Sequence, residues 1–363
     1  MSSESDYQDL LASLPEWVAE NGFQQYGICD AEPGEHVDRL MEWLAQGYHG
    51  EMDYMERHAD LRANPASLVP GALRIISVRM DYLPAEPKFK ENLSSTDRGY
   101  ISRYALGRDY HKVIRSRLRK LELRIKAWLE QNQQSGFTAR VFTDSAPLLE
   151  KAYAEKAGLG WIGKNTLLLN RQAGSWFFLG EIVTNLPLPT SQIQHKNECG
   201  SCKACMTICP TGAIVAPYTL DARKCISYLT IEHRGSIAVE LRALIGNRIF
   251  GCDDCQITCP WNRFANISTE ADFSPRNKLD SATLLELFEW TEDEFLKKTE
   301  GSPIRRTGYQ GWLRNIAVAL GNAPHSELII KALAEKRFIA GDLVAEHIDW
   351  AIARQTSHSP SSG

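Results

Sequence analysis

The chain has 363 residues, of which 43% are hydrophobic, and this is enough to bury a substantial core in two or three domains. Forty-one Lys and Arg residues against 45 Asp and Glu residues give a formal charge of −4, which excludes a general attraction to polyanions, so a nucleic acid would have to meet a local basic patch. The first residues form no export signal, and no run approaches the ~18 apolar residues of a membrane span. We therefore expect a cytoplasmic protein without a membrane partner.

The first half of the chain alternates helical and strand-like segments. An amphipathic helix is predicted over 10–22, a β-branched strand over 73–83, a long helix over 110–132 and a strand over 137–144. This alternation predicts an α/β or α+β domain.

A second helix is predicted over 147–158, with Pro147 near its first turn and Gly158 at its end. Two strand-like runs follow, at 165–170 and 175–185, separated by a Gly-containing turn. Before the first run, "GLGWIG" at 158–163 fits the G-x-G-x-x-G pattern, but it follows a helix, whereas a dinucleotide site requires this pattern after a strand and before a helix. We interpret the segment as a Gly-rich loop whose backbone can approach a cofactor closely.

The last third of the chain has a helical pattern from about residue 275 onward. The segment "LRNIAVALGN" at 313–322 is echoed by "AEHIDWAIAR" at 345–354, which resembles a short helical repeat of the HEAT type. The small polar tail, residues 356–363, is expected to be disordered.

Eight of the nine cysteines lie between Cys199 and Cys259, and in a cytosolic protein such clustering indicates metal or redox ligands rather than disulfides. The remaining one, Cys29, is expected in the core. The first run, "CGSCKACMTICP", has the C-x2-C-x2-C-x3-C-P spacing of bacterial [4Fe–4S] sites. In such sites three thiolates hold one cluster and the fourth, before proline, ligates the other cluster.

The second run, "CDDCQITCP", is one cysteine short, because Ile249 stands where the spacing demands a ligand. The unassigned cysteine nearby is Cys225. The spacing therefore predicts two complete [4Fe–4S] ligand sets: Cys199, Cys202, Cys205 and Cys259 for one cluster, and Cys209, Cys225, Cys252 and Cys255 for the other. A pair of four-cysteine zinc sites is the alternative, although zinc ribbons do not need the C-x3-C-P extension.

The stretch "DYH", Asp109 to His111, matches the start of a D-x-H-x-x-G cobalamin-ligating signature, but Ile114 stands where glycine belongs. No lower axial histidine is indicated by this pattern.

Several motifs together resemble the epoxyqueuosine reductase family: "SRYALGRDYH", "RVFTDSAPLLEKAYAEKAGLGWIGKNTLLLN", "GSWFFLGEI", "KCISYLT", "GNRIFGCDDCQITCPWN" and "GWLRNIAVALGN". The resemblance implies an α+β protein with a nitroreductase-like cobalamin-binding α/β domain (1–190), a ferredoxin-like domain with two [4Fe–4S] clusters (191–270) and a HEAT-like helical domain that binds tRNA (271–355). It also implies an oxidoreductase that reduces epoxyqueuosine to queuosine at the wobble position of tRNAs with GUN anticodons, those for Asp, Asn, His and Tyr. Cob(I)alamin fed by the two clusters would drive this last step of queuosine biosynthesis.

The same resemblance implies that Asp144, in "FTDSAP", is the proton donor over the cobalamin, with a pKa raised by burial beside the macrocycle. On the sequence alone, Asp144 would be read as a helix N-cap. The cobalamin contacts implied by the family motifs are Arg62, Ser102, Asp144, Leu168, Leu179, Ser227, Cys252 and Asp253. On its own, Arg62 would be a solvated surface arginine.

For tRNA, the resemblance favours Arg305, Arg306 and Arg314. A second basic group follows one face of the predicted long helix: Arg115, Arg117, Arg119, Lys120, Arg124 and Lys126. That group can equally be a solvated helix face.

Three functions remain open at this stage: the tRNA-modifying reductase, a cobalamin-dependent reductive dehalogenase, and a non-catalytic electron-transfer protein. Dehalogenases of this kind usually carry a twin-arginine signal, which these first residues lack. The reductase would need a low-potential electron donor such as a flavodoxin or ferredoxin, and we expect it to act as a monomer.

Overall fold

The structure is a computed structural model that describes residues 7–193 and 195–357. A four-stranded sheet organises the N-terminal half, and each neighbouring pair of its strands is antiparallel. In spatial order the strands are β1 (Gln25–Asp30), β2 (Arg74–Asp81), β7 (Phe177–Thr184) and β4 (Ala139–Phe142). The predicted strands 73–83 and 137–144 thus lie in one sheet, with β4 at its edge.

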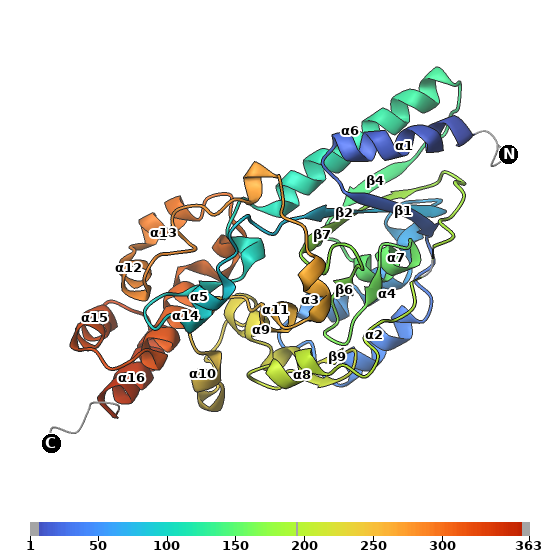
Figure 1. The fold of residues 1–363 in the computed structure, drawn as a ribbon. Helices are drawn as coiled ribbons and strands as arrows, with labels where there is room; N and C mark the ends of the chain where they lie inside the picture. The colour runs from blue at the N-terminus through green and yellow to red at the C-terminus, as the bar shows by residue number, and fades with distance from the viewer. Residues whose placement is uncertain (1–6, 194, 358–363) are drawn as a thin grey trace.

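Helices cover both faces of this sheet (Figure 1). The helices α1 (Gln8–Glu20) and α6 (Tyr110–Gln131) pack on one face, where they share a core with Ile76 and Val78 of β2. Helix α7 (Glu150–Lys156) packs on the other face with Ile75 and the core residue Cys29. Successive residues of a strand point to opposite faces, so the apolar strand pattern of β2 supplies two cores.

Helix α7 begins later than its sequence suggests. It starts at Glu150 with Leu149 as its N-cap residue, so Pro147 lies in the preceding loop and Asp144 caps no helix. The N-cap interpretation of Asp144 is therefore wrong. The loop between β4 and α7 instead holds Asp144 in the left-handed region at φ 55°, which is uncommon outside glycine and tolerated best by Asp and Asn.

The Gly-rich loop after α7 leads into a small hairpin of β5 (Trp161–Ile162) and β6 (Leu168–Leu169). A Cβ atom on Gly160 would lie 2.0 Å from the backbone oxygen of Leu169. Gly160 therefore allows the loop to lie close to the backbone of β6. We had expected this loop to approach a cofactor instead. The other short elements of this half are α2 (His36–Ala45), α3 (Asp53–Arg57), α4 (Ala59–Ala63), η2 (Pro65–Ser67), α5 (Phe89–Ser94), β3 (Tyr100–Ile101) and η3 (Arg103–Ala105).

The cysteine-rich region consists of short elements joined by loops. They are α8 (Ala204–Ile208), β8 (Ile214–Ala216), β9 (Thr219–Leu220), η4 (Ala222–Lys224), α9 (Ile226–Ile231), α10 (Val239–Ile245), β10 (Arg248–Phe250), α11 (Asp254–Ile257) and η5 (Pro260–Phe264). Strand β10 pairs in parallel with β3, so a segment near residue 100 packs beside the cysteines. The domain boundaries expected along the chain remain predictions, and the pairing of β3 with β10 joins residues on either side of the first boundary.

The C-terminal part is helical, as predicted. It contains η6 (Ala271–Phe273), α12 (Leu284–Glu289), α13 (Glu292–Lys298), η7 (Pro303–Thr307), α14 (Gly308–Asn322), α15 (Glu327–Arg337) and α16 (Asp342–Ser357). The two repeat-like segments form most of α14 and α16, whose apolar residues share one core. Helix α16 includes residues 356 and 357 of the expected disordered tail, and residues 358–363 lie outside the described residues.

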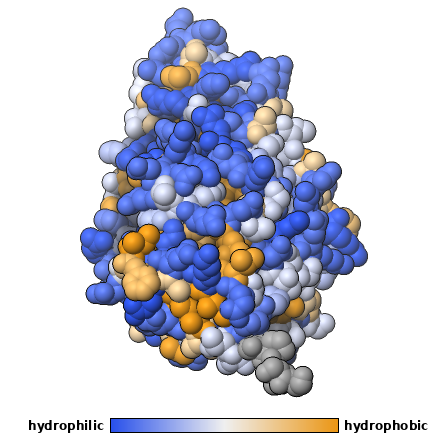
Figure 2. Space-filling model, turned by 90° about the vertical axis from the view of Figure 1, so that its left-hand side faces the viewer, coloured by the Kyte–Doolittle hydropathy of each residue, from blue (hydrophilic) through white to orange (hydrophobic). Residues whose placement is uncertain are grey.

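Figure 2 shows the side of the molecule that carries the C-terminal helices; hydrophilic side chains dominate it, and apolar ones gather in its lower half. Apolar atoms interspersed in this way are usual for protein surfaces. Within residues 7–193 and 195–357, no helix has the length and apolarity to cross a bilayer.

Candidate active site and cysteine centres

Four cysteines line one cavity of about 250 Å³, and they are the four that the spacing assigns to the first cluster. Cys199 and Cys202 lie in the loop before α8, Cys205 lies in α8, and Cys259 follows α11. The ammonium group of Lys164 donates hydrogen bonds to the backbone oxygens of Gly200 (2.5 Å) and Cys202 (2.9 Å) and so ties this loop to the N-terminal half. Four thiols around one hollow fit the donor set of an iron–sulfur cluster.

A second group of thiols lies deeper. Burial raises the pKa of Cys255 well above its usual value, and the neighbouring Cys225, Asp253 and Cys209 raise it further. Burial likewise raises the pKa of Cys225, to which Cys209 also contributes.

The fourth expected member of this second group, Cys252, donates a hydrogen bond to Asp254 at 2.8 Å. Burial is the largest cause of the raised pKa of Cys252, followed by the charge of Asp254. In the described parts of the chain, all nine cysteines are free thiols and no three His, Cys, Asp or Glu side chains converge tightly enough to hold a single metal ion. The two ligand sets remain predictions.

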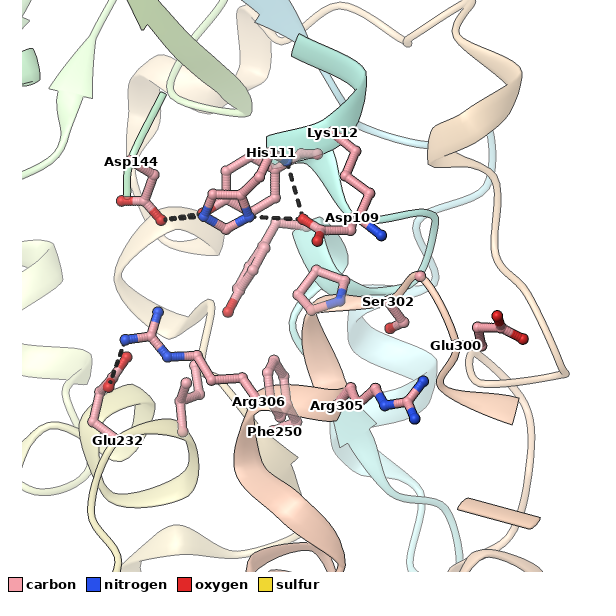
Figure 3. A pocket seen from close by; sticks show the side chains of 15 residues that line it. Asp109, His111, Lys112, Asp144, Glu232, Phe250, Glu300, Ser302, Arg305 and Arg306 are labelled. Atoms are coloured by element: carbon pink, nitrogen blue, oxygen red, sulfur yellow. Dashed lines mark hydrogen bonds and ion pairs between the residues drawn. The ribbon is translucent and has the colours of Figure 1, made fainter. Parts of the chain in front are cut away.

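A larger pocket, of about 550 Å³, lies where the three parts of the chain meet (Figure 3). The N-terminal half contributes Asp144 and the start of α6, the cysteine-rich region contributes Glu232 and Phe250, and the C-terminal part contributes Arg305 and Arg306. The full lining is Tyr104, Asp109, Tyr110, His111, Lys112, Asp144, Ile231, Glu232, Phe250, Glu300, Gly301, Ser302, Pro303, Arg305 and Arg306. The predicted proton donor and two predicted tRNA contacts therefore share one pocket.

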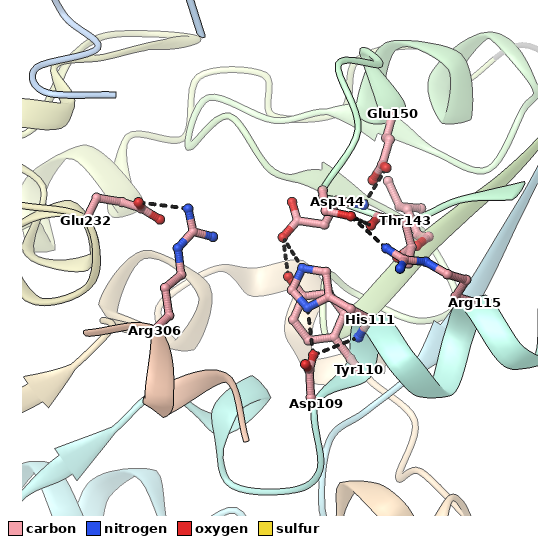
Figure 4. A network of polar contacts seen from close by, with 11 residues as sticks. Asp109, Tyr110, His111, Arg115, Thr143, Asp144, Glu150, Glu232 and Arg306 are labelled. Carbon is pink, nitrogen blue, oxygen red and sulfur yellow. Dashed lines mark hydrogen bonds and ion pairs between the residues drawn. The ribbon is translucent and has the colours of Figure 1, made fainter. Parts of the chain in front are cut away.

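Asp144 is held by a polar network at the start of α6 (Figure 4). His111 places Nε2 3.1 Å from Asp144 Oδ2 and Nδ1 2.7 Å from Asp109 Oδ1, and Tyr110 donates its hydroxyl hydrogen to the same Asp144 oxygen. Asp109 also caps α6 by accepting the backbone N–H of His111 at 3.1 Å. Two carboxylates thus share one imidazole.

The proton in this network sits on the imidazole. Burial raises the pKa of Asp144, but hydrogen bonds from His111 and Tyr110 outweigh burial and leave it below the usual value. Burial lowers the pKa of His111, but Asp109 and Asp144 raise it to about 9. We expected a raised pKa for Asp144, but among the chain's own residues this pKa is lowered. His111 therefore holds the proton at neutral pH.

A pH-dependent stability follows from this raised pKa. Folded His111 binds its proton more tightly than unfolded His111, whose pKa is near 6.5, so the stabilisation is complete below about pH 6.5 and is lost as the pH rises through about 9. We expect the free energy of unfolding to fall by about 1–3 kcal/mol over this range in the wild type and by clearly less in His111→Gln. Urea denaturation at several pH values measures this, and equal losses in both proteins would contradict the assignment.

Two carboxyl groups lie behind Asp144, those of the half-buried Glu150 and the buried Glu181, and the sequence pattern did not single them out. Glu150 accepts the backbone N–H of Asp144, and Glu181 of β7 accepts the hydroxyl hydrogen of Ser77 at 3.0 Å. Burial raises the pKa of Glu181 to about 8 and that of Glu150 well above its usual value. The sequence did offer one signal for Glu181, because a glutamate within an otherwise apolar strand indicates a buried carboxyl group.

Of the predicted cobalamin contacts, Asp144 lines this pocket and the others lie outside its lining. Ser102 donates a hydrogen bond to Asp253, and both side chains are buried. The backbone oxygen of Leu179 accepts the hydroxyl hydrogen of Thr143, directly before Asp144. Leu168 is buried in β6, and Ser227 lies in α9 two residues after Cys225.

Arg62 departs from its expected surface position. It is buried in α4 and donates a 3.1 Å hydrogen bond to the backbone oxygen of Tyr54. Burial is the largest cause of the raised pKa of Tyr54, and the neighbouring Glu232 also raises it while Arg306 lowers it. Arg62 thus approaches the pocket through Tyr54.

Arg314 does not fit its predicted role as a tRNA contact. Its side chain is 0% exposed and donates hydrogen bonds to the backbone oxygens of Leu229, His233 and Gly235. Because this guanidinium ties α14 to the cysteine-rich region, it cannot reach a phosphate without disrupting the core. The prediction for Arg314 is wrong.

Thiol groups spaced for two clusters, beside a pocket that holds a carboxylate and an imidazolium, define an iron–sulfur oxidoreductase. A family model described as "4Fe-4S double cluster binding domain" matches residues 198–262, and one described as "Epoxyqueuosine reductase QueG, DUF1730" matches residues 62–145.

Full-length relatives extend this match. A curated epoxyqueuosine reductase from Pseudomonas aeruginosa is 57% identical over 352 residues, covering 97% of this chain and 96% of the relative. One from Escherichia coli is 57% identical over 355 residues, covering 98% and 92%. The chain belongs to the epoxyqueuosine reductase family and is an oxidoreductase, which confirms the interpretation of the motifs.

Solved structures agree with this assignment. A crystal structure of epoxyqueuosine reductase with a tRNA-Tyr epoxyqueuosine-modified stem loop has a TM-score of 0.85 and 30% identity, covering 96% of this chain and 91% of that one. The enzyme from Streptococcus thermophilus has a TM-score of 0.81 and 28% identity, covering 98% and 92%. The predicted α+β fold class is confirmed, and the reductase is favoured over the dehalogenase and electron-transfer alternatives.

Proposed function

We propose that this protein reduces epoxyqueuosine to queuosine at the wobble position of tRNAs with GUN anticodons. The observation that carries the proposal is the pocket that Asp144, His111, Arg305 and Arg306 line together. A carboxyl–imidazole pair can supply protons, and arginines at the same pocket can hold the phosphates that flank a base. A family relative solved with an epoxyqueuosine-modified stem loop supports the same substrate.

The chemistry requires both protons and electrons. Conversion of an epoxide to an alkene breaks two C–O bonds, releases the oxygen as water, and consumes two electrons and two protons. The proton that His111 holds 3.1 Å from Asp144 is positioned to pass to the oxygen through Asp144 as a C–O bond breaks. We propose Asp144 as the acid and His111 as the group that keeps it supplied.

In a solved structure of epoxyqueuosine reductase from Bacillus subtilis, the catalytic loop that carries an aspartate is swung out of the active site. In this chain Asp144 lies in the loop between β4 and α7, at a left-handed backbone position. A movable loop of this kind would let the acid withdraw while a bulky substrate enters. Asp144 at such a position supports the proposed role.

For the clusters, we propose the two ligand sets predicted from the spacing: Cys199, Cys202, Cys205 and Cys259 for the outer cluster, and Cys209, Cys225, Cys252 and Cys255 for the inner cluster. The cavity shared by the first four thiols supports the outer set. The contributions of Cys209 to the raised pKa of Cys225, and of Cys225 and Cys209 to that of Cys255, support the inner set. To bind iron, the Cys252 thiol would have to lose the proton that it now shares in a hydrogen bond with Asp254.

For cobalamin, the pocket offers aromatic and aliphatic walls at Tyr104, Ile231 and Phe250 together with polar groups, a mixture suited to a large macrocycle with amide side chains. We propose that Arg62, Ser102, Leu168, Leu179, Ser227, Cys252 and Asp253, which lie outside the lining of this pocket, contact other parts of the macrocycle. When bound, cobalamin would be the low-potential centre that delivers electrons to the substrate, and the two clusters would pass electrons to it. The chain's own residues then orient the substrate and hold its proton.

We further propose a low-potential electron donor, such as a flavodoxin or ferredoxin. The three parts of a single chain supply all the residues named for the reaction, which supports a monomer. Its tRNA substrate supports action in the cytoplasm.

The substrate is tested by nucleoside mass spectrometry of tRNA from cells that lack this protein. We expect epoxyqueuosine to accumulate and the wild-type gene, but not Asp144→Asn, to restore queuosine. Normal queuosine levels in the deletion strain would overturn the proposed function.

Removal of the two pocket arginines should weaken tRNA binding. Arg305 is exposed, and Arg306 pairs with Glu232 at 2.9 Å, so Arg305→Ala with Arg306→Ala removes two cations at the pocket and leaves the core intact. We expect about 10-fold weaker binding at low salt and a log–log salt slope reduced by about two. Electrophoretic or anisotropy titrations at several salt concentrations measure this.

The matched control replaces two exposed, ion-paired cations elsewhere, Arg39 and Lys331, by alanine. This control should bind tRNA like the wild type. An equal loss of affinity in both double variants would show that general charge, and not the pocket, is responsible.

A further inference from the structure

A second cavity, of about 690 Å³, adjoins the pocket that holds Asp144. One wall is the first half of α6, where Lys112, Ser116 and Lys120 recur every four residues and therefore lie on one helix face. The opposite wall comes from the segment around Arg276 and from the end of α13 at Lys297. From Lys112 to Lys120 this face extends for roughly 12 Å.

The cavity is strongly basic although the whole chain carries a formal charge of −4. Its ionisable lining comprises six cationic side chains, Arg108, Lys112, Arg117, Lys120, Arg276 and Lys297, and three acidic ones, Asp109, Asp272 and Glu300. Such a local excess can attract a polyanion that the molecule as a whole would not attract.

Two of these cations are neutralised by neighbours. Arg108 pairs with Asp272 at 3.1 Å, and Arg117 pairs with Glu270. Within the described residues, Lys112, Lys120 and Lys297 take part in no ion pair. These three ammonium groups are therefore available to an external anion.

Other charged positions of the same helix provide a contrast. Arg119 pairs with Glu122, Arg124 pairs with Glu20, and Lys126 lies 3.8 Å from Glu130. These positions have the internally balanced charges of an ordinary solvated helix face. The excess of unpaired charge is confined to the part of α6 that adjoins the pocket.

The cavity and the pocket are adjacent, because Asp109, Lys112, Glu300 and Gly301 line both. We call the second cavity, lined by Lys112, Lys120 and Lys297, the basic groove. We infer that it binds the sugar–phosphate backbone of the tRNA anticodon arm on one side of the nucleotide that enters the pocket. The inference rests on the proposed function. Lysines suit this task because their contacts with phosphate position a nucleic acid without reading its sequence.

The test uses the full-length protein carrying Lys120→Glu and Lys297→Glu. Binding of an anticodon stem-loop RNA should weaken by about 10–100-fold near physiological salt, and the log–log salt slope should fall by about two. The matched control, Lys126→Glu with Lys331→Glu, makes the same change of charge at lysines that already have acidic neighbours. Its affinity should equal that of the wild type.

The readouts separate this inference from the proposed function. If the wild type reduces epoxyqueuosine in tRNA but the groove variant binds the stem loop as tightly as the control, the groove inference is overturned. If the wild type neither binds nor reduces the tRNA, the proposed function fails as well. Cysteine-bound iron content and the thermal unfolding midpoint, compared among the three proteins, show whether weaker binding reflects loss of the fold.

Discussion

Asp144→Asn should lower the rate of epoxide reduction on tRNA by about 10²–10⁴-fold, the usual effect of losing a positioned acid. The amide can still meet the hydrogen bonds that reach Asp144 from Tyr110 and His111, but it cannot carry a proton to the epoxide oxygen. Single-turnover assays with epoxyqueuosine-modified tRNA measure the loss. Unchanged rates would remove Asp144 from the mechanism.

Asparagine is the informative substitution for structural reasons. Asp144 occupies a left-handed backbone position at φ 55°, which asparagine adopts more readily than alanine. Because Asp144 caps no helix, the change should leave the start of α7 intact. The control Asp38→Asn alters an exposed carboxylate on α2 and should keep full activity.

Combination with His111→Gln tests whether the two groups act as one proton donor. If His111 only supplies Asp144, then the double variant should be no slower than Asp144→Asn alone, because residues that act as a unit are not additive. Independent, multiplying losses would contradict the shared proton.

Cys225→Ser should remove the inner cluster, lower the bound iron by about half and nearly abolish turnover, because electrons could no longer pass between the outer cluster and the reaction centre. The contribution of Cys209 to the raised pKa of Cys225 shows that these two thiols are neighbours. Iron analysis and electron paramagnetic resonance of the reduced protein measure the outcome.

The matched control is Cys29→Ala. Cys29 is buried in the N-terminal core, where its thiol lies 3.5 Å from the backbone oxygen of Tyr153, far along the chain from the other cysteines. This variant should keep both clusters. Two complete cluster signals in Cys225→Ser would show that another residue completes the inner set.

Cysteine spacing was the most informative part of the sequence, because cluster ligation depends on short local intervals along the chain. The same local reasoning could not place Asp144. The rule that ligands gather at the ends of strands applies to parallel sheets, whereas β4 is the edge strand of an antiparallel sheet. Asp144 reaches the pocket through the loop that follows β4.

Long-range packing explains the remaining differences between prediction and structure. Arg314 looked like a surface cation because its burial depends on backbone oxygens about 80 residues earlier in the chain. His111 was noticed only as part of an incomplete cobalamin signature, and its raised pKa depends on Asp109 and also on Asp144, which is 33 residues away. Neither relation can be read from periodicity or composition.

The pairing of β3 with β10 constrains how the protein is made. Tyr100 and Ile101 are completely buried, but their partner strand at Arg248–Phe250 leaves the ribosome much later. Until then, the nascent chain exposes apolar surface that its own N-terminal half cannot cover. A fragment that ends before β10 would therefore be prone to aggregate, and the cysteine-rich region must be synthesised before the first half can complete its fold.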